Sequence, residues 1–244
     1  MTDLRFEFHT AETVKSTNTT VKELAKNGAP EGYVLSASAQ TRGRGRLNRI
    51  FFSPKGTGLY CSLLLRPSVP LPSYALTCMA AVALCETIES YSISCGIKWV
   101  NDVYVNGRKA AGILVESAIG SGGVIQYAVV GIGVNLFPPQ AGFPESISEK
   151  AGAVFSSEPD ETLKKQFLKR LMTRIKVYYD ALPEIGFYDS YRSRMILLGK
   201  EILFSDPEGM RRASVIDLDP EFRLRIRTDS GEIRSLDRGE VTFL

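Results

Sequence analysis

Apolar residues recur with two different spacings along the chain, and these spacings predict its strands and helices. Predicted strands cover 6–14, 33–39, 58–66, 97–99, 103–105, 108–117 and 127–136, and predicted helices cover 19–26, 73–91 and 163–182. Strand 58–66 is apolar on both faces, which is typical of a central strand covered on both sides. The pattern therefore predicts an α/β domain.

The pattern changes after Gly199, where short strands alternate with turn signals. Phe222, Leu224 and Ile226 alternate with arginines, which is the period of a half-buried strand. About 50 residues of this kind predict a small β-barrel appended to the α/β domain. We expect a larger domain over 1–193 and a smaller one over 194–244.

Composition limits the class of protein. The 244 residues include 30 Lys and Arg, 27 Asp and Glu, one His and 44% hydrophobic residues, which argues against a disordered, collagenous or disulfide-stapled chain. The longest nearly apolar run, 75–85, is too short to cross a bilayer, and the charged N-terminus does not read as a signal peptide. The four Cys lack CxxC spacing. We therefore expect reduced thiols in a cytoplasmic protein.

Charge is distributed unevenly within this balance. No Asp or Glu occurs between Glu31 and Glu86. The same window contains Arg42, Arg44, Arg46, Arg49, Lys55 and Arg66. A positive segment inside a balanced protein indicates a local anion site, whereas a nucleic-acid binder is more often basic throughout.

The run 41–49 combines glycine and arginine in a way that suits a polyphosphate. Gly43 and Gly45 let the backbone approach a ligand closely, and the intervening guanidiniums bind phosphate oxygens. Positioned cations also stabilise the charge that develops on departing pyrophosphate. The spacing is not that of a P-loop. The alternative interpretation is RNA binding of the RGG type. That type of binding uses repeated motifs in a disordered segment, whereas this single run lies between two predicted strands.

Two further segments carry candidate chemistry. Lys98, Asn101 and Asp102 cluster at the end of a short strand. One interpretation is a phosphate site in which Asp102 holds Mg²⁺ together with substrate phosphates. The alternative is an ordinary turn, in which Asn and Asp are common. Lys109 begins an otherwise apolar strand, where it points into a cleft or extends from an edge to solvent.

The remaining signals suggest binding and not covalent catalysis. Residues 16–18 (Ser-Thr-Asn) stand where side chains cap a helix. Gly131 and Gly133 form a GxG without the third glycine of a dinucleotide fingerprint, so they indicate a close backbone approach. No nucleophile motif exists, and His9 is the one histidine.

The order of these motifs along the chain resembles that of the biotin protein ligases, in the short bacterial form without a DNA-binding domain. The resemblance runs from about residue 10 to the end. It implies a mixed-sheet catalytic domain of the biotin/lipoate ligase type with a small SH3-like C-terminal barrel. It also implies that biotin and ATP give biotinyl-5′-AMP and pyrophosphate with Mg²⁺, and that biotin then passes to a lysine of a biotin carboxyl carrier protein, as in biotin–[acetyl-CoA-carboxylase] ligases.

The resemblance assigns roles to the motif residues. The implied biotin contacts are Ser16, Thr17, Asn18, Gln40, Gly43, Arg44, Gly45, Arg46, Lys109, Gly112, Ile113, Leu114, Gly131 and Ile132. The implied contacts to ATP and the adenylate are Arg46, Arg49, Phe51, Lys98, Asn101, Asp102, Lys109 and Asn135. Lys109, Arg44 and Arg46 are the implied catalytic residues, and Asp102 is the implied Mg²⁺ ligand.

The resemblance also sets expectations about partners and departures. It implies no tightly bound prosthetic group, no nucleic-acid or membrane partner, and a monomer or homodimer. Val100 stands where the family usually has Pro, and Asn48 where Gly is usual. Two alternatives stay open: a lipoate or octanoate ligase of the same fold, and a non-enzymatic nucleic-acid binder that uses the 42–49 loop and the arginines of 223–227.

Overall fold

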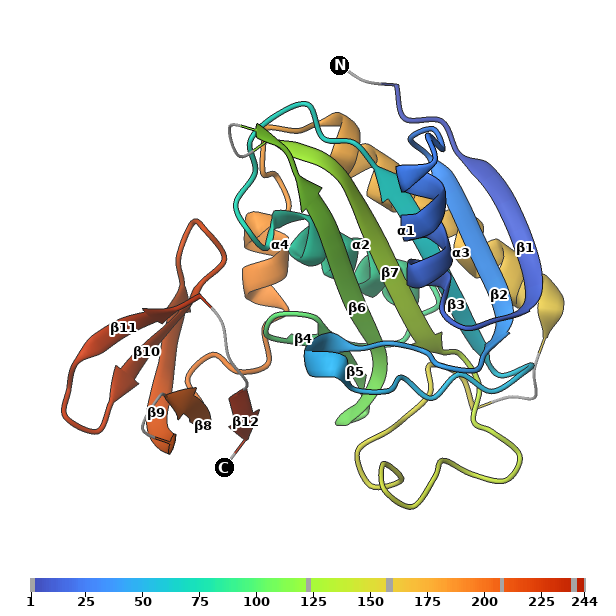
Figure 1. Ribbon diagram of the computed structural model, residues 1–244. Helices are drawn as coiled ribbons and strands as arrows, with labels where there is room; N and C mark the ends of the chain where they lie inside the picture. The colour runs from blue at the N-terminus through green and yellow to red at the C-terminus, as the bar shows by residue number, and fades with distance from the viewer. Residues whose placement is uncertain (1–2, 122–123, 157–159, 207–208, 238–240, 244) are drawn as a thin grey trace.

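A seven-stranded mixed sheet forms the centre of the larger part of the computed structural model (Figure 1), which describes residues 3–121, 124–156, 160–206, 209–237 and 241–243. Its strands are β1 (Glu7–Val14), β2 (Tyr33–Gln40), β3 (Gly58–Leu65), β4 (Gly96–Lys98), β5 (Asp102–Val105), β6 (Arg108–Ile119) and β7 (Ile125–Asn135). They lie in the order β1-β2-β3-β7-β6-β5-β4. β1 and β2 are parallel, and the other neighbouring pairs are antiparallel. The predicted mixed sheet is confirmed.

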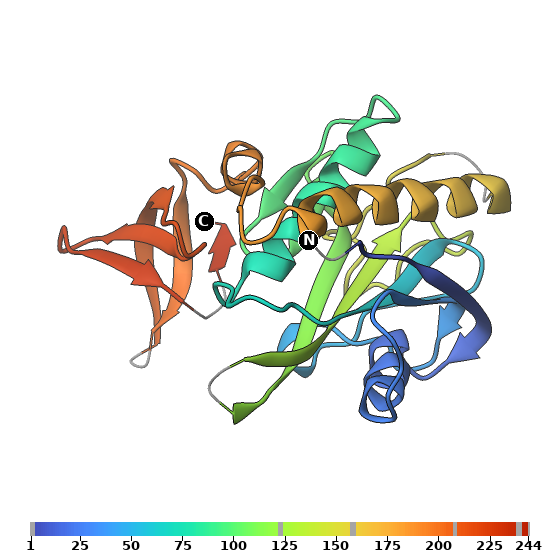
Figure 2. The same ribbon diagram turned by 90° about the horizontal axis from the view of Figure 1, so that it is seen from above.

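Helices cover both faces of this sheet (Figures 1 and 2). α1 (Thr17–Lys26) lies on one face, and α2 (Ala75–Glu89) and α3 (Glu161–Asp180) lie on the other. α2 is apolar nearly all round because it is buried between the sheet and α3. The predicted helices and strands of this part lie within two residues of the observed bounds. The pattern missed only the short α4 (Tyr188–Ser193) among the described helices of four or more residues.

A second, antiparallel sheet follows at the C-terminal end of the chain (Figure 1). It contains β8 (Glu201–Asp206), β9 (Gly209–Leu218), β10 (Leu224–Thr228), β11 (Ile233–Leu236) and β12 (Val241–Phe243), in the order β11-β10-β9-β8-β12. Phe222, Leu224 and Ile226 are fully buried, as their alternation with arginines predicts.

Aromatic residues join the two parts. Trp99 Nε1 donates to the carbonyl oxygen of Phe222 at 2.8 Å, and the Phe222 ring stacks on Phe187 with 5.6 Å between centroids. The expected boundary at 193/194 falls between α4 and β8. Buried residues of both sheets share one hydrophobic core, so a division into two independent domains stays a prediction.

Candidate active site

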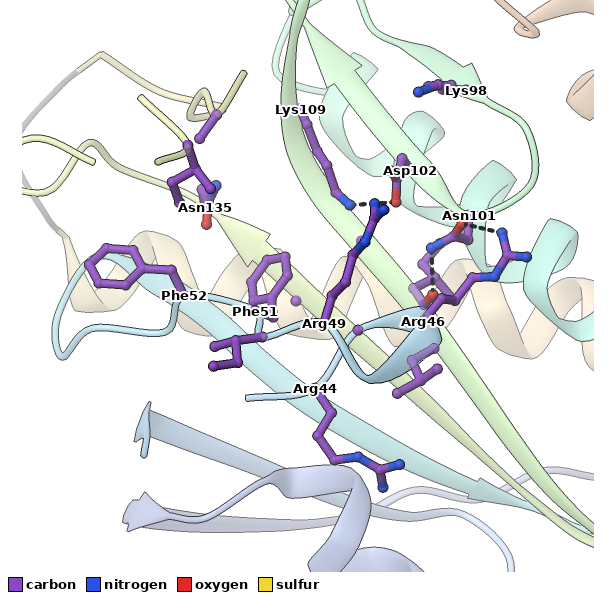
Figure 3. A pocket seen from close by; sticks show the side chains of 18 of the residues that line it. Arg44, Arg46, Arg49, Phe51, Phe52, Lys98, Asn101, Asp102, Lys109 and Asn135 are labelled. Carbon is purple, nitrogen blue, oxygen red and sulfur yellow. Dashed lines mark hydrogen bonds and ion pairs between the residues drawn. The ribbon is translucent and has the colours of Figure 1, made fainter. Parts of the chain in front are cut away.

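A cavity of about 510 Å³ lies between the start of α1, the Gly/Arg loop, the β5–β6 hairpin and residues 147–151 (Figure 3). Most of the residues singled out in the sequence meet there, although they come from segments far apart in the chain. The predicted site residues that line it are Ser16, Thr17, Asn18, Gln40, Arg44, Gly45, Arg46, Arg49, Phe51, Lys98, Asn101, Asp102, Lys109, Gly112, Ile113, Leu114, Gly131, Ile132 and Asn135. Their individual roles stay predictions.

One end of the cavity is uncharged and polar. The backbone N–H of Thr17 donates to Gln40 Oε1 at 2.8 Å, and the Thr17 hydroxyl donates to the same oxygen at 3.2 Å. Gln40 Nε2 donates to Ser53 Oγ at 2.9 Å. Ser16 occupies the N-cap position of α1, but its side chain makes no capping hydrogen bond. The capping role predicted from residues 16–18 is therefore wrong for Ser16; Gln40 accepts instead from Thr17, the first N–H of the helix.

Asn18 has its carboxamide fixed in one orientation at this end. Its Nδ2 donates to the carbonyl oxygen of Leu114 at 3.1 Å and to Glu116 Oε2 at 3.2 Å. Its Oδ1 accepts from Ser62 Oγ at 2.6 Å. A Cβ on Gly131 would collide with this carboxamide. Gly131 is therefore needed because the Asn18 side chain packs directly on the β7 backbone.

The isoleucines predicted to border the ligand contribute little side-chain surface. Ile113 and Ile132 are 1% and 2% exposed and belong to the main core beneath the sheet. Successive side chains of a strand point to opposite faces, so Gly112 and Gly131 face the cavity while the isoleucines face away. Both residues nevertheless line the cavity, so their predicted biotin contacts stay predictions, made with little exposed side chain.

The Gly/Arg run forms a narrow hairpin. Arg44 pairs with Ile50, and the N–H of Phe51 donates to the Gly43 oxygen at 2.9 Å. Gly43 is buried and does not line the cavity; a Cβ there would lie 2.4 Å from the Phe51 oxygen. Gly43 therefore packs at the base of the hairpin, and its predicted biotin contact stays a prediction. Asn48, at the tip, has a φ of 59°, a conformation that Asn tolerates.

A β-bulge aims Lys109 into the cavity. Tyr104 pairs with Lys109 and Val103 pairs with Ala111, so Ala110 is an extra residue in β6. Lys109 and Gly112 consequently share one face although three positions separate them, and a Cβ on Gly112 would lie 3.4 Å from Lys109 Cε. Bulges commonly redirect a side chain in this way. Lys109 Nζ lies 2.7 Å from Asp102 Oδ1 on the neighbouring strand.

Cations gather around this ion pair. Arg46 Nη1 donates to Asn101 Oδ1 at 3.1 Å, and Asn101 Nδ2 donates to the Ile113 oxygen at 3.0 Å. Figure 3 shows Arg49 reaching from the loop toward Lys109 and Asp102. Among the described residues, the whole cavity is lined by six cationic side chains (Arg44, Arg46, Arg49, Lys98, Lys109 and Lys150) and two acidic ones (Asp102 and Glu149). Arg44 points away from this ion pair and binds Glu116 beside Asn18 (Figure 3). The geometry favours a polyanion at this end.

Phe51 lies over two glycines between the polar and cationic ends. A Cβ on Gly133 would lie 2.6 Å from the Phe51 ring, and one on Gly112 would lie 3.5 Å from it. The ring also meets Tyr60 edge to face. The two glycines of β7 thus make room for two different side chains: Gly131 for Asn18 and Gly133 for Phe51.

Several cavity residues were not found from the sequence. Tyr104 lines the wall beside Lys109, and burial, with the nearby charge of Asp102, raises its pKa to about 12. Thr242 and Phe243 of β12 also line the cavity, and Lys98 Nζ lies 5.4 Å from the centroid of the Phe243 ring. These residues could not be found from the sequence, because none of them lies in a motif typical of a binding site.

Other chemistries receive no support from the described residues. His9, on the edge strand β1, stacks on Tyr33 of β2 and is not among the cavity residues. The four Cys are free. The described part of the chain holds no group of three or more potential metal ligands from His, Cys, Asp and Glu. Within the same residues, no helix is both long and apolar enough to span a membrane.

Comparison with known proteins places this site in a family. Residues 10–135 match the model of the biotin/lipoate A/B protein ligase family. The bifunctional ligase/repressor BirA of Bacillus subtilis is 31% identical over 225 residues, which cover 90% of this chain and 69% of that protein. The biotin–[acetyl-CoA-carboxylase] ligase of Mycobacterium tuberculosis is 29% identical over 94% of this chain and 86% of its own length.

A solved structure agrees with these matches. The biotin protein ligase from Aquifex aeolicus in complex with biotin and ATP superposes with a TM-score of 0.79 and 28% identity, covering 98% of both chains. The sequence match includes the start of α1, the Gly/Arg loop, Lys109 and the glycines of β7, which together form the cavity. This chain belongs to the biotin/lipoate A/B protein ligase family.

Proposed function

We propose that this protein is a biotin protein ligase that joins biotin to a lysine of a biotin carboxyl carrier protein in two steps, with biotinyl-5′-AMP as the intermediate. The observation that carries the proposal is the cavity itself, whose uncharged polar end and cationic end meet at Lys109. A neutral ureido group both donates and accepts hydrogen bonds, which suits Thr17, Asn18 and Gln40. The cationic end suits the phosphates of ATP.

The first step is the adenylation of biotin. A carboxylate oxygen of biotin attacks the α-phosphorus of ATP, a new phosphorus–oxygen bond forms, and pyrophosphate leaves with the electron pair of the broken bond. Both reactants are anions, so they repel each other without countercharge. Lys109 stands where it can contact both groups, while Arg46 and Arg49 reduce the charge on the departing pyrophosphate. Orientation and charge stabilisation account for the step without an enzyme nucleophile.

The second step transfers the biotinyl group. The neutral amine of the carrier lysine attacks the acyl carbon, a carbon–nitrogen bond forms, and AMP leaves with the electrons of the broken carbon–oxygen bond. The proton released from nitrogen passes to solvent. The mixed anhydride must be shielded from water, because hydrolysis would compete with attack by the amine. The hairpin that contains Arg44 and Arg46 lines the cavity, and we infer that it covers the intermediate.

A magnesium ion fits this site when it arrives with the nucleotide. Mg²⁺ usually binds one or two protein carboxylates together with substrate phosphates and waters. Asp102 is the carboxylate beside Lys109, 20% exposed, and it would provide that single protein ligand. When bound, Mg²⁺ supplies charge neutralisation on the phosphates. The residues around it, Asn101 and Lys98, would then orient those phosphates by hydrogen bonds.

The names of the relatives support an acetyl-CoA carboxylase carrier as the acceptor. Free thiols suit a reducing compartment, so we propose that the reaction takes place in the cytoplasm. The oligomeric state, monomer or homodimer, stays a prediction.

The test is ATP–pyrophosphate exchange by the purified protein with Mg²⁺ and biotin, lipoate, octanoate or no acid. Exchange with biotin alone is the expected result. Exchange with lipoate or octanoate instead would keep the fold and move the protein to the lipoate branch of the family. No exchange with any acid from a folded sample would overturn the proposed activity.

A further inference from the structure

Glu116 lies beside two cavity-lining residues, Asn18 and Arg44, at a point where three segments meet. It is on β6, on the same face as Gly112 and Leu114, and its side chain is 15% exposed. It is not among the cavity-lining residues. Its carboxylate nevertheless contacts α1 and the Gly/Arg loop, which lie far from it in the sequence.

Both oxygens of this carboxylate are shared between partners. Oε2 accepts from Asn18 Nδ2 at 3.2 Å and from Arg44 Nη1 at 3.1 Å. Oε1 accepts from Lys22 Nζ at 3.1 Å and from Arg44 at 3.2 Å. One carboxylate thus holds two side chains that line the cavity, the amide of Asn18 and the guanidinium of Arg44 in the loop.

The charge balance keeps Glu116 ionised. Burial acts to raise the pKa of Glu116, but hydrogen bonds from Asn18 and Lys22 and the charge of Arg44 hold this pKa below its ordinary value. An ionised carboxylate accepts hydrogen bonds and donates none. It therefore forces the NH₂ group of Asn18 toward itself, which leaves the amide oxygen as the acceptor on the other side, where Ser62 donates.

We propose that Glu116 is a positioning residue that couples occupancy of the biotin slot to closure of the 42–49 loop, through Asn18 on one side and Arg44 on the other. The coupling rests on the proposed function, because it takes biotin as the ligand beside Asn18. A ligand that hydrogen-bonds to Asn18 adds to the contacts that already hold this side chain. It thereby also strengthens the hold on the carboxylate that Arg44 binds, so the loop opens less often. By thermodynamic reciprocity, a loop held by Arg44 strengthens binding of the ligand.

The experiment compares Glu116→Gln with the wild type in two independent measurements. The first is native-state cleavage by trypsin after Arg46 and Arg49, with and without biotin. The second is ATP–pyrophosphate exchange at varied biotin. In Glu116→Gln we expect cleavage without ligand to be about tenfold faster and the KM for biotin to rise about tenfold, while kcat stays within about twofold. Biotin should protect the loop of the wild type and not that of the variant.

Two controls separate positioning from general destabilisation. Glu12→Gln removes an exposed ion pair with Lys55 and should leave both measurements unchanged. Arg44→Gln breaks the same tether from the loop side and keeps the proposal testable if Glu116→Gln fails to fold. The double variant should be no more sensitive to trypsin than either single variant, because both remove one interaction.

The outcomes also separate this proposal from the proposed function. Two results would overturn the tether between Glu116 and Arg44. One is loop cleavage at the wild-type rate in both Glu116→Gln and Arg44→Gln, and the other is additive effects on cleavage in the double variant. Faster cleavage with an unchanged KM for biotin would overturn the coupling. Faster cleavage in a protein that neither binds biotin nor supports exchange would refute both the coupling and the ligase activity, and it would leave a purely structural tether.

Discussion

Lys109 Nζ lies 2.7 Å from Asp102 Oδ1, across a hairpin in which Ala110 is the extra residue of a bulge. The pair is half-shielded, with 35% and 20% of the two side chains exposed. In this arrangement Asp102 holds the ammonium group at the junction of the polar and cationic ends of the cavity. The ammonium group can leave this carboxylate for two substrate anions without crossing a large distance.

Replacing Lys109 by Ala should abolish most adenylation and spare the fold. The side chain provides charge at the reacting centre, so we expect biotin-dependent pyrophosphate exchange to fall by about a thousandfold. The free energy of unfolding should change by no more than about 1 kcal/mol, because the ion pair is partly exposed. Exchange kinetics and urea unfolding measure the two effects. Lys55→Ala, which breaks an exposed pair outside the cavity, is the matched control; near-normal turnover in Lys109→Ala would remove this lysine from the site.

The two glycines of β7 should affect different substrates. A Cβ on Gly131 meets the Asn18 carboxamide, whereas one on Gly133 meets the Phe51 ring. We therefore expect Gly131→Ala to raise the KM for biotin and Gly133→Ala to raise the KM for ATP, each by about tenfold, which is a cost of about 1.4 kcal/mol. Steady-state exchange at varied biotin and varied ATP separates the two.

A second-site change tests the cause of the Gly133 effect. Phe51→Ala removes the ring that the new methyl group would strike, so the double variant Gly133→Ala/Phe51→Ala should differ little from Phe51→Ala alone. Fully additive losses would show that the methyl group acts on something other than Phe51.

Much of the site could be predicted because its residues lie in short motifs. The Gly/Arg run, the Lys98–Asp102 turn and Lys109 each carry a local chemical signal, and all of them meet at the cavity. The orientation of Lys109 could not be derived, since it depends on a bulge that appears only when β5 and β6 pair. A strict alternation would have placed Lys109 and Gly112 on opposite faces.

Longer-range packing explains the other differences. Ser16 makes none of the capping hydrogen bonds that the sequence pattern predicts. Gln40 accepts from the first N–H of α1 instead, because β2 ends beside the start of the helix. Ile113 and Ile132 line the cavity as predicted, but their side chains also belong to the core, which their motifs alone do not show. Thr242 and Phe243 reach the cavity only because the second sheet packs against the first part of the molecule.

Acid should weaken the fold partly through Glu116. Its pKa is lowered in the folded protein by Asn18, Lys22 and Arg44 against the effect of burial. A carboxyl group with a depressed folded pKa contributes stability that is complete above its unfolded pKa, about 4.3, and that is lost as the pH falls through the folded value. The difference in unfolding free energy between wild type and Glu116→Gln, about 1 kcal/mol at neutral pH, should therefore shrink below pH of about 4. Urea unfolding of both proteins between about pH 7 and about pH 3 measures this difference, because this interval brackets the usual pKa range of carboxyl groups. A difference that grows in acid would contradict the assignment.

Arg46 should control how long the intermediate stays bound. Its guanidinium donates to Asn101 Oδ1, and Asn101 is in turn fixed to the backbone of Ile113, so the loop is attached to the sheet at this point. Arg46→Gly removes that attachment and adds backbone freedom. We expect biotinyl-5′-AMP to dissociate about tenfold faster, with a smaller effect on its formation. Arg42→Gly, at an exposed position outside the cavity lining, adds the same freedom without breaking the contact and should release the intermediate at the wild-type rate. The dissociation rate of radiolabelled adenylate measures this difference. Equal acceleration in both variants would mean that loop stiffness, and not the Arg46–Asn101 hydrogen bond, retains the intermediate.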